Sequence, residues 1–212
     1  PYSPGYHPFA WRGWWDFGSG ALGDMACHTM NMPFMGLDLR NPTSVVAETS
    51  GHNKDSFPKW SVITYEFPAT DDRPALKMVW YDGGKRPDKE LLDGRDLAAS
   101  GCIVSGDKGK MYATIDYAEK YELIGGIEEP KVEFEESPGH FAEWIRAMKE
   151  GKAATSNFPD YAVPLTETVL LGNLAVWADG KKIEWDAENL KATNAPEVEE
   201  LIRPKYRAGY SL

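Results

Sequence analysis

The stretch WRGWWDFGSGALGDMACHTMN, residues 11–31, is the part of the chain around which the rest is organised. Its glycines, in GSGALG at positions 18–23, predict a tight turn, because glycine adopts backbone conformations that are closed to other residues. Ser19 is placed to cap a following helix, and Pro33 is placed to end it. The stretch therefore predicts an aromatic lead-in, a turn and a helix over residues 21–32.

One face of this predicted helix is polar. Asp24, His28 and Asn31 fall at positions i, i+4 and i+7, which lie on one stripe of a helix. Histidine transfers protons near neutral pH. Asp24, in the first helical turn, would be favoured as an anion by the helix dipole and would raise the basicity of His28 or hold a substrate hydroxyl. The stripe indicates a small-molecule site, although a solvated Asp/His pair or a helix cap is the commoner role for this spacing.

The opposite side of the same helix is apolar, and the spacing turns Leu22, Met25, Ala26 and Met30 inward. A metal site is not predicted, because Asp24 and His28 supply only two ligands. The other histidines, at positions 7, 52 and 140, lie at no helpful spacing for completing such a site.

The turn also matches the dinucleotide-binding pattern G-x-G-x-x-G over Gly18–Gly23, and Glu48 follows roughly where a ribose-binding acid would lie. That fingerprint requires a buried apolar strand directly before its glycines. Here the preceding residues are WRGWWDF, which include a charged arginine and aspartate. We therefore predict no cofactor-binding residues in this chain.

Composition restricts the classes of partner. The chain has 212 residues, of which 42% are hydrophobic, and this is enough for one domain with a substantial core. A net charge of −10 argues against nucleic acid or an anionic membrane as partner. No apolar run is long enough for a transmembrane helix. Two cysteines, Cys27 and Cys102, do not make a disulfide framework.

The remaining pattern predicts an α+β fold with an open, mainly antiparallel (mixed) β-sheet and helices packed on one face. Turn-rich segments separate short alternating runs, so consecutive strands are expected to pair antiparallel. Strands are predicted at 44–50, 59–67, 75–81, 101–105, 110–114, 121–124, 131–134 and 183–186. Helices are predicted at 88–92, 138–150, 163–178 and 196–202.

Neither face of the predicted sheet is clearly solvent-like. In residues 61–67 and 76–81, apolar and aromatic side chains occur on both alternating sets. One face is expected to cover helices. The other is expected to meet a second subunit, giving a homo-oligomer through the open sheet face, and the alternative is a sheet with a few exposed aromatic residues.

The quoted stretch resembles the start of the C-terminal domain of the Gfo/Idh/MocA family of sugar-directed, NAD(P)-dependent oxidoreductases. Four later stretches are similar to one bacterial branch of it: HFAEWIRAMKEGK, PLTETVLLGNLA, IEWD and YRAGYSL. The resemblance covers essentially the whole chain. It implies an α/β domain whose large open sheet follows a Rossmann domain and carries part of the substrate site and the subunit interface.

The resemblance also implies roles for individual residues. His28 would be the acid/base at the sugar hydroxyl being oxidised, and Asp24 would orient the sugar or that histidine. An acid often follows the family's histidine by three residues, and here Asn31 stands in that place. We further expect Trp11, Arg12 and Trp15 to line the sugar pocket, because an aromatic face suits a pyranose and arginine donates hydrogen bonds to its hydroxyls.

The family's nucleotide-binding domain and its Glu-Lys-Pro motif do not occur in this sequence, which begins at Pro1 without an initiator methionine. Residues 1–212 are therefore interpreted as a C-terminal substrate-binding and oligomerisation domain. NAD or NADP would be bound by the full-length enzyme, and this chain alone would be inactive. The alternatives are a stand-alone binding or dimerisation module without catalysis, and an NAD-dependent glycosidase of the same family.

Overall fold

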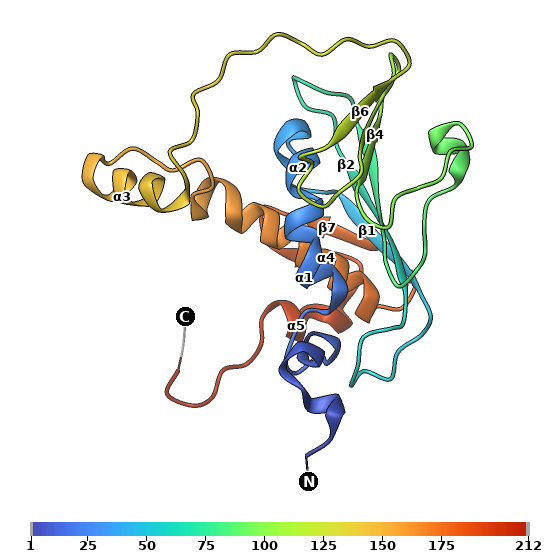
Figure 1. Cartoon of the computed structure of the whole chain (residues 1–212). Helices are drawn as coiled ribbons and strands as arrows, with labels where there is room; N and C mark the ends of the chain where they lie inside the picture. Colours follow the sequence, from blue (N-terminus) through green and yellow to red (C-terminus); the bar gives the residue numbers. More distant parts are fainter. Residues whose placement is uncertain (1, 211–212) are drawn as a thin grey trace.

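The computed structural model describes residues 2–210, and its architecture is α+β (Figure 1). The larger sheet has five strands in the order β3-β2-β1-β7-β8, and every pairing given for it is antiparallel. Its strands are β1 (Ser44–Thr49), β2 (Ser61–Phe67), β3 (Leu76–Tyr81), β7 (Ile183–Asp186) and β8 (Lys191–Ala192). The predicted antiparallel pairing of consecutive strands is confirmed.

A second, three-stranded antiparallel sheet has the order β4-β5-β6. Its strands are β4 (Cys102–Ser105), β5 (Lys110–Ala113) and β6 (Tyr121–Ile124). The sequence predicted these strands but not their separation into a sheet of their own. The strand predicted at 131–134 is wrong, because these residues are exposed and form no strand. A hydrophobic alternation this short does not hold a strand without a neighbouring edge to pair with.

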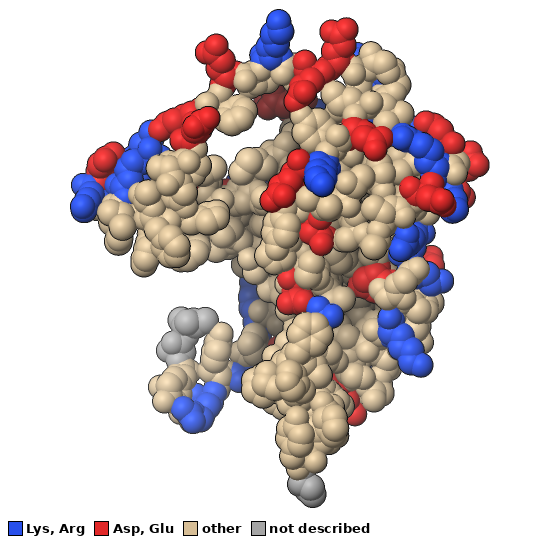
Figure 2. Space-filling view, in the orientation of Figure 1, with Lys and Arg blue, Asp and Glu red and all other residues tan. Residues whose placement is uncertain are grey.

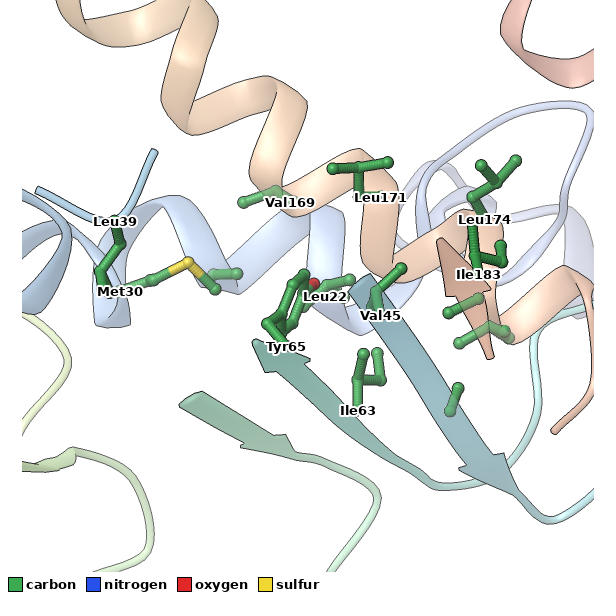
Figure 3. Packing of buried hydrophobic residues seen from close by; sticks show 14 of the residues in the cluster. Leu22, Met30, Leu39, Val45, Ile63, Tyr65, Val169, Leu171, Leu174 and Ile183 are labelled. Atoms are coloured by element: carbon green, nitrogen blue, oxygen red, sulfur yellow. The ribbon is translucent and has the colours of Figure 1, made fainter. Parts of the chain in front are cut away.

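Helix α4 (Val163–Trp177) packs on β1 and β2 and covers one face of the larger sheet. Its composition is apolar around most of its circumference, as expected for a helix enclosed by other elements. Helix α1 (Gly20–Thr29) packs in turn on α4. Figure 3 shows the resulting core, in which inward side chains of the sheet, including Val45, Ile63 and Tyr65, meet side chains of both helices. The predicted packing of helices on one sheet face is confirmed.

The predicted helix at 21–32 is divided into two. Helix α1 ends at Thr29, and α2 (Asn31–Leu37) begins after Met30. Pro33 was expected to end a helix, but it lies buried in the first turn of α2. A proline is accommodated there because the first backbone N–H groups of a helix have no intrahelical partner. Ser19 occupies the N-cap position of α1, but its side chain makes no capping hydrogen bond.

Helix α3 (His140–Glu150) projects from the body as an arm, connected to β6 by a long segment without regular structure (Figure 1). None of its residues is buried, and its apolar residues Phe141, Trp144, Ile145 and Met148 are exposed. The helix predicted at 138–150 is confirmed, with His140 as its first residue.

Figure 2 shows charged side chains interspersed with uncharged surface on the face of the molecule in view.

Short helical segments complete the described chain: η1 (Pro4–Tyr6), η2 (Pro8–Gly13), η3 (Lys89–Leu92), the π-helical η4 (Phe158–Ala162), η5 (Pro196–Val198) and α5 (Glu199–Ile202). The residues ahead of the quoted stretch include the whole of η1 and the first part of η2, so two 3-10 helices lead into α1. Within residues 2–210, no helix has the length and apolar character needed to span a bilayer.

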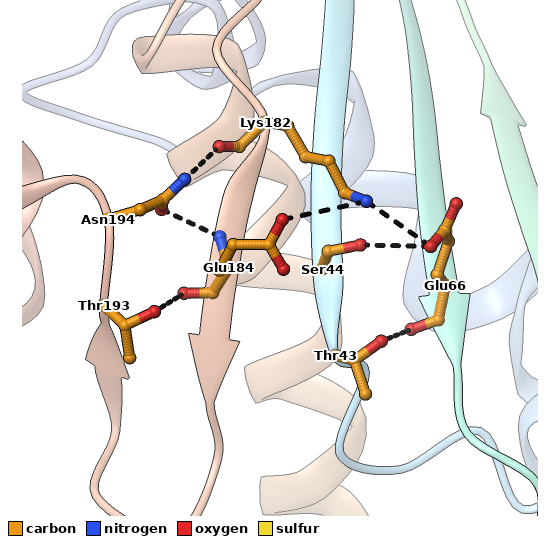
Figure 4. A network of polar contacts seen from close by, with 7 residues as sticks. All are labelled: Thr43, Ser44, Glu66, Lys182, Glu184, Thr193 and Asn194. Carbon is orange, nitrogen blue, oxygen red and sulfur yellow. Dashed lines mark hydrogen bonds and ion pairs between the residues drawn. The ribbon is translucent and has the colours of Figure 1, made fainter.

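The sheet face opposite the helices changes character along its length. Val46, Thr64 and Val79 lie in one row across β1, β2 and β3, and all three are half-buried. At one end of this face, Lys182 lies 3.5 Å from Glu66 and 3.8 Å from Glu184 (Figure 4). The centre of the face is therefore mainly apolar, and this end is polar.

Candidate functional site

The exposed face of α1 carries Asp24 and His28, one helical turn apart. They are held there because Leu22 and Ala26 on the other side of the helix, and Met30 directly after its end, are buried in the core. Both polar side chains are open to solvent, so a small molecule has access to the imidazole. Asp24 is the fifth residue of α1 and lies beyond its first turn, so the expected stabilisation of Asp24 by the helix dipole is wrong.

Arg12 closes one end of this face. It comes from η2, and its guanidinium forms an ion pair with the carboxylate of Asp24. The same guanidinium lies 4.8 Å from the centre of the Phe9 ring. The Arg12 and Asp24 side chains are 40% and 45% exposed, so the pair contributes little to the free energy of unfolding. The ion pair instead holds the Arg12 guanidinium and the Asp24 carboxylate side by side, one helical turn before His28.

A loop from the smaller sheet closes the other end. This loop connects β5 to β6, and its Tyr117 ring lies 5.2 Å from the imidazole ring of His28, centre to centre. Asp116 accepts hydrogen bonds from the Ser100 hydroxyl and from Thr29 Oγ1, the latter at 2.7 Å. These two hydrogen bonds lower the pKa of Asp116, and the neighbouring His28 contributes in the same direction.

Sequence reasoning missed Asp116 and Tyr117. They occur together before a predicted edge strand, which is the only local signal they give. Nothing in the sequence pattern joins this loop to α1, which lies some ninety residues earlier in the chain. The hydrogen bond from Thr29 to Asp116 makes that connection in three dimensions.

The structure places the other predicted site residues in different surroundings. Trp11 is half-exposed, and its indole N–H donates to the Tyr6 carbonyl at 2.8 Å. Trp15 stacks on Phe57 with 3.6 Å between ring centres, and it packs edge-on against Trp177. Trp15 therefore belongs to an aromatic cluster at the edge of the core, and it makes no contact with His28 among those that the structure gives for residues 2–210.

Asn31 lies beyond the end of α1, as the first residue of α2. Its side-chain oxygen accepts a hydrogen bond of 2.5 Å from the hydroxyl of Tyr161. The predicted stripe of three polar residues is therefore reduced to Asp24 and His28, because the helix is interrupted before Asn31.

The surface has one depression next to the Asp24/His28 face and another beside the aromatic cluster of Trp15. One, of about 290 Å³, adjoins the first turn of α1 and is lined in part by Arg12, Lys59 and Asn173. The other, of about 340 Å³, is lined in part by His52, Lys54 and Trp177. The first shares Arg12 with the α1 face and extends it toward the sheet.

The glycine-rich turn does not have the surroundings of a dinucleotide site. The residues before Gly18 form the 3-10 helix η2 and a turn, where the fingerprint requires a strand. Gly20 has φ of +70°, and a Cβ there would lie 2.6 Å from the Phe57 ring. Glycine is therefore required at position 20 by the backbone conformation of the turn and by the close packing of Phe57. In the described part of the chain, no group of three or more His, Cys, Asp or Glu side chains is arranged to hold a metal ion.

Comparison with protein-family models gave a match over the whole chain. A family model described as "Oxidoreductase family, C-terminal alpha/beta domain" matches residues 1–212. The match therefore includes α1 with its exposed face, both sheets and the projecting helix α3. A comparison with curated proteins gave no match.

Proposed function

The chain belongs to the Gfo/Idh/MocA oxidoreductase family, as its C-terminal alpha/beta domain, and on that premise we propose that it forms the substrate side of an NAD(P)-dependent sugar oxidoreductase. The observation that carries this proposal is the exposed Asp24/His28 face of α1. The face lies between Arg12 at one end and Tyr117 at the other. It offers a proton acceptor, an ion pair and aromatic surface to one small molecule.

The chemistry proposed for this face is removal of a proton. Oxidation of a secondary alcohol removes a hydride from carbon and a proton from the attached hydroxyl. A ring nitrogen of His28 accepts that proton as general base. Arg12 donates to neighbouring sugar oxygens, and the Asp24 carboxylate accepts from neighbouring hydroxyls. These contacts orient the carbon that loses hydride.

The nicotinamide cofactor, NAD or NADP, would supply the hydride acceptor when it is bound by the full-length enzyme. The residues around Gly18–Gly23 do not fit this role, because no strand leads into the turn. We therefore assign cofactor binding to the nucleotide-binding domain expected in the full-length protein. This chain alone is expected to be inactive.

The experiment uses the full-length protein with D-glucose, D-galactose, N-acetyl-D-glucosamine and myo-inositol, each with NAD⁺ and with NADP⁺. We expect reduced nicotinamide to form in equal amount to an oxidised sugar with at least one pair. Hydrolysis of aryl glycosides of these sugars without net formation of reduced cofactor would instead support the NAD-dependent glycosidase. Binding of a sugar without either reaction would support a module without catalysis.

We also propose that the open face of the larger sheet forms a contact between copies of the chain. Its central row of Val46, Thr64 and Val79 is half-buried and carries no charge. Apolar sheet surface of this kind is favourable to cover in an oligomer.

Replacing Val62 by glutamate tests this contact, because Val62 lies on the same face, between Glu48 of β1 and Tyr81 of β3. Enclosing an unpaired carboxylate costs several kcal/mol, so we expect the full-length variant to dissociate to smaller species in light scattering. Val132→Glu is the matched control, because Val132 is 64% exposed on the segment leading to α3. An unchanged mass for Val62→Glu would remove this face as the interface.

A further inference from the structure

The loop between β5 and β6, residues 114–120, is attached to α1 through Asp116 and exposes the next residue, Tyr117, to solvent. Asp116 is half-buried and accepts hydrogen bonds from Thr29 on α1 and from Ser100. Two backbone hydrogen bonds close the loop on itself, from Thr114 to Lys120 at 3.2 Å and from Ala118 to Ile115 at 3.2 Å. The position of the loop relative to His28 is therefore set by specific bonds.

Tyr117 follows directly and is 64% exposed. Its ring lies beside the His28 imidazole at 5.2 Å with an angle of 59° between the ring planes. Much of the Tyr117 side chain is therefore accessible to solvent. An aromatic side chain held in this way offers a flat apolar surface and one hydrogen-bonding group to a molecule bound at His28.

We propose that Tyr117 contacts the substrate and helps to determine which ring is accepted, and that Asp116 is a positioning residue that holds Tyr117 in place. This inference rests on the proposed function, because it takes His28 as the site of reaction. The C–H groups on one face of a pyranose or cyclitol ring lie against the tyrosine ring. The tyrosine hydroxyl then exchanges a hydrogen bond with one ring hydroxyl.

The role of Asp116 follows from its bonding. Both hydroxyl donors use the same carboxylate oxygen, Oδ1. An asparagine presents an amide oxygen in that place and accepts the same two hydrogen bonds, whereas alanine loses both. Asp116→Asn therefore keeps the loop anchored, and Asp116→Ala releases it.

The test measures kcat and KM of the full-length enzyme with the best sugar of the panel named above. For Tyr117→Ala we expect KM to rise roughly tenfold with kcat within about twofold, because a contact made equally to substrate and transition state is lost. Tyr117→Phe keeps the stacking surface and is expected to raise KM by only about threefold. Asp116→Ala is expected to raise KM roughly fivefold, and Asp116→Asn by less than about twofold.

The double variant Asp116→Ala/Tyr117→Ala separates positioning from a general loss of structure. If Asp116 acts through Tyr117, the double variant has the KM of Tyr117→Ala, because the second change removes nothing further. Multiplication of the two single effects would overturn the positioning role. A fall in kcat for Asp116→Asn would also overturn it, because Asp116 would then act on the reaction through its charge.

Failure of this inference is distinguishable from failure of the proposed function. Wild-type turnover of a sugar together with an unchanged KM for Tyr117→Ala would overturn the role of Tyr117 and leave His28 in place. Absence of wild-type turnover on every sugar of the panel would remove the proposed function and this inference with it. Circular dichroism spectra equal to wild type for each variant exclude a loss of helices and strands as the cause of a changed KM.

Discussion

Replacing His28 by alanine in the full-length enzyme is expected to lower kcat by roughly 10²–10⁴-fold, the usual contribution of a positioned general acid or base. The fold is expected to remain intact, because His28 is exposed and α1 is held by residues on its opposite side. The measurement is the rate of reduced-cofactor formation at saturating sugar. Thermal unfolding of the same sample checks the fold.

His140→Ala is the matched control, since His140 is also exposed but begins α3, away from α1 in the chain. We expect it to retain wild-type kcat. Near-normal turnover of His28→Ala would show that the proton leaves the sugar by another route. In that case Asp24 and Arg12 would remain substrate contacts, and the reaction itself would have to be placed elsewhere.

Replacing Gly172 by valine is expected to cost about 3 kcal/mol or more of the free energy of unfolding, at the upper end of the usual effect of overpacking a core. Gly172 lies within α4 where this helix crosses β2 and meets α1. A Cβ at this position would overlap the Tyr65 hydroxyl oxygen and would lie 2.5 Å from Leu22 Cδ2. The absence of a side chain lets helix and sheet approach each other here. Urea unfolding followed by tryptophan fluorescence measures the effect.

Gly36→Val controls for the change in helix propensity, because a Cβ at Gly36 in α2 meets nothing within 4 Å. Valine is a better helix former than glycine, so this variant is expected to have the wild-type stability or to exceed it by less than about 1 kcal/mol. Tyr65→Phe removes the hydroxyl oxygen that a side chain at position 172 would overlap. The fully buried Tyr65 hydroxyl has no hydrogen-bond partner among the described residues, so this change alone is expected to be neutral or stabilising. Equal losses for Gly172→Val and Gly36→Val would contradict the close approach.

Most regular elements could be predicted from the sequence, because their signals are local. The apolar run that forms α4 and the alternation that forms β2 each report on their own surroundings. The ends of helices were predicted less reliably than the helices themselves. Pro33 was expected to stop a helix, and it instead lies in the first turn of the next one. The same residue type suits both places, and the local sequence does not distinguish them.

The candidate site could be predicted only in part, for a different reason. Asp24 and His28 lie on one helix, so their spacing alone places them together. Trp15 and Asn31 were expected to join them, but tertiary packing pairs Trp15 with Phe57 and Asn31 with Tyr161. Tyr117 reaches His28 through a contact between segments far apart in the chain, and such contacts leave no periodic trace.

A crystal structure of the full-length enzyme with the oxidised cofactor and the best sugar of the panel tests the proposed role of His28 most directly. We predict a sugar hydroxyl within hydrogen-bond distance of a ring nitrogen of His28, with Arg12 and Tyr117 on either side. A sugar bound instead in the depression lined by His52, Lys54 and Trp177, with α1 free of substrate, would contradict it.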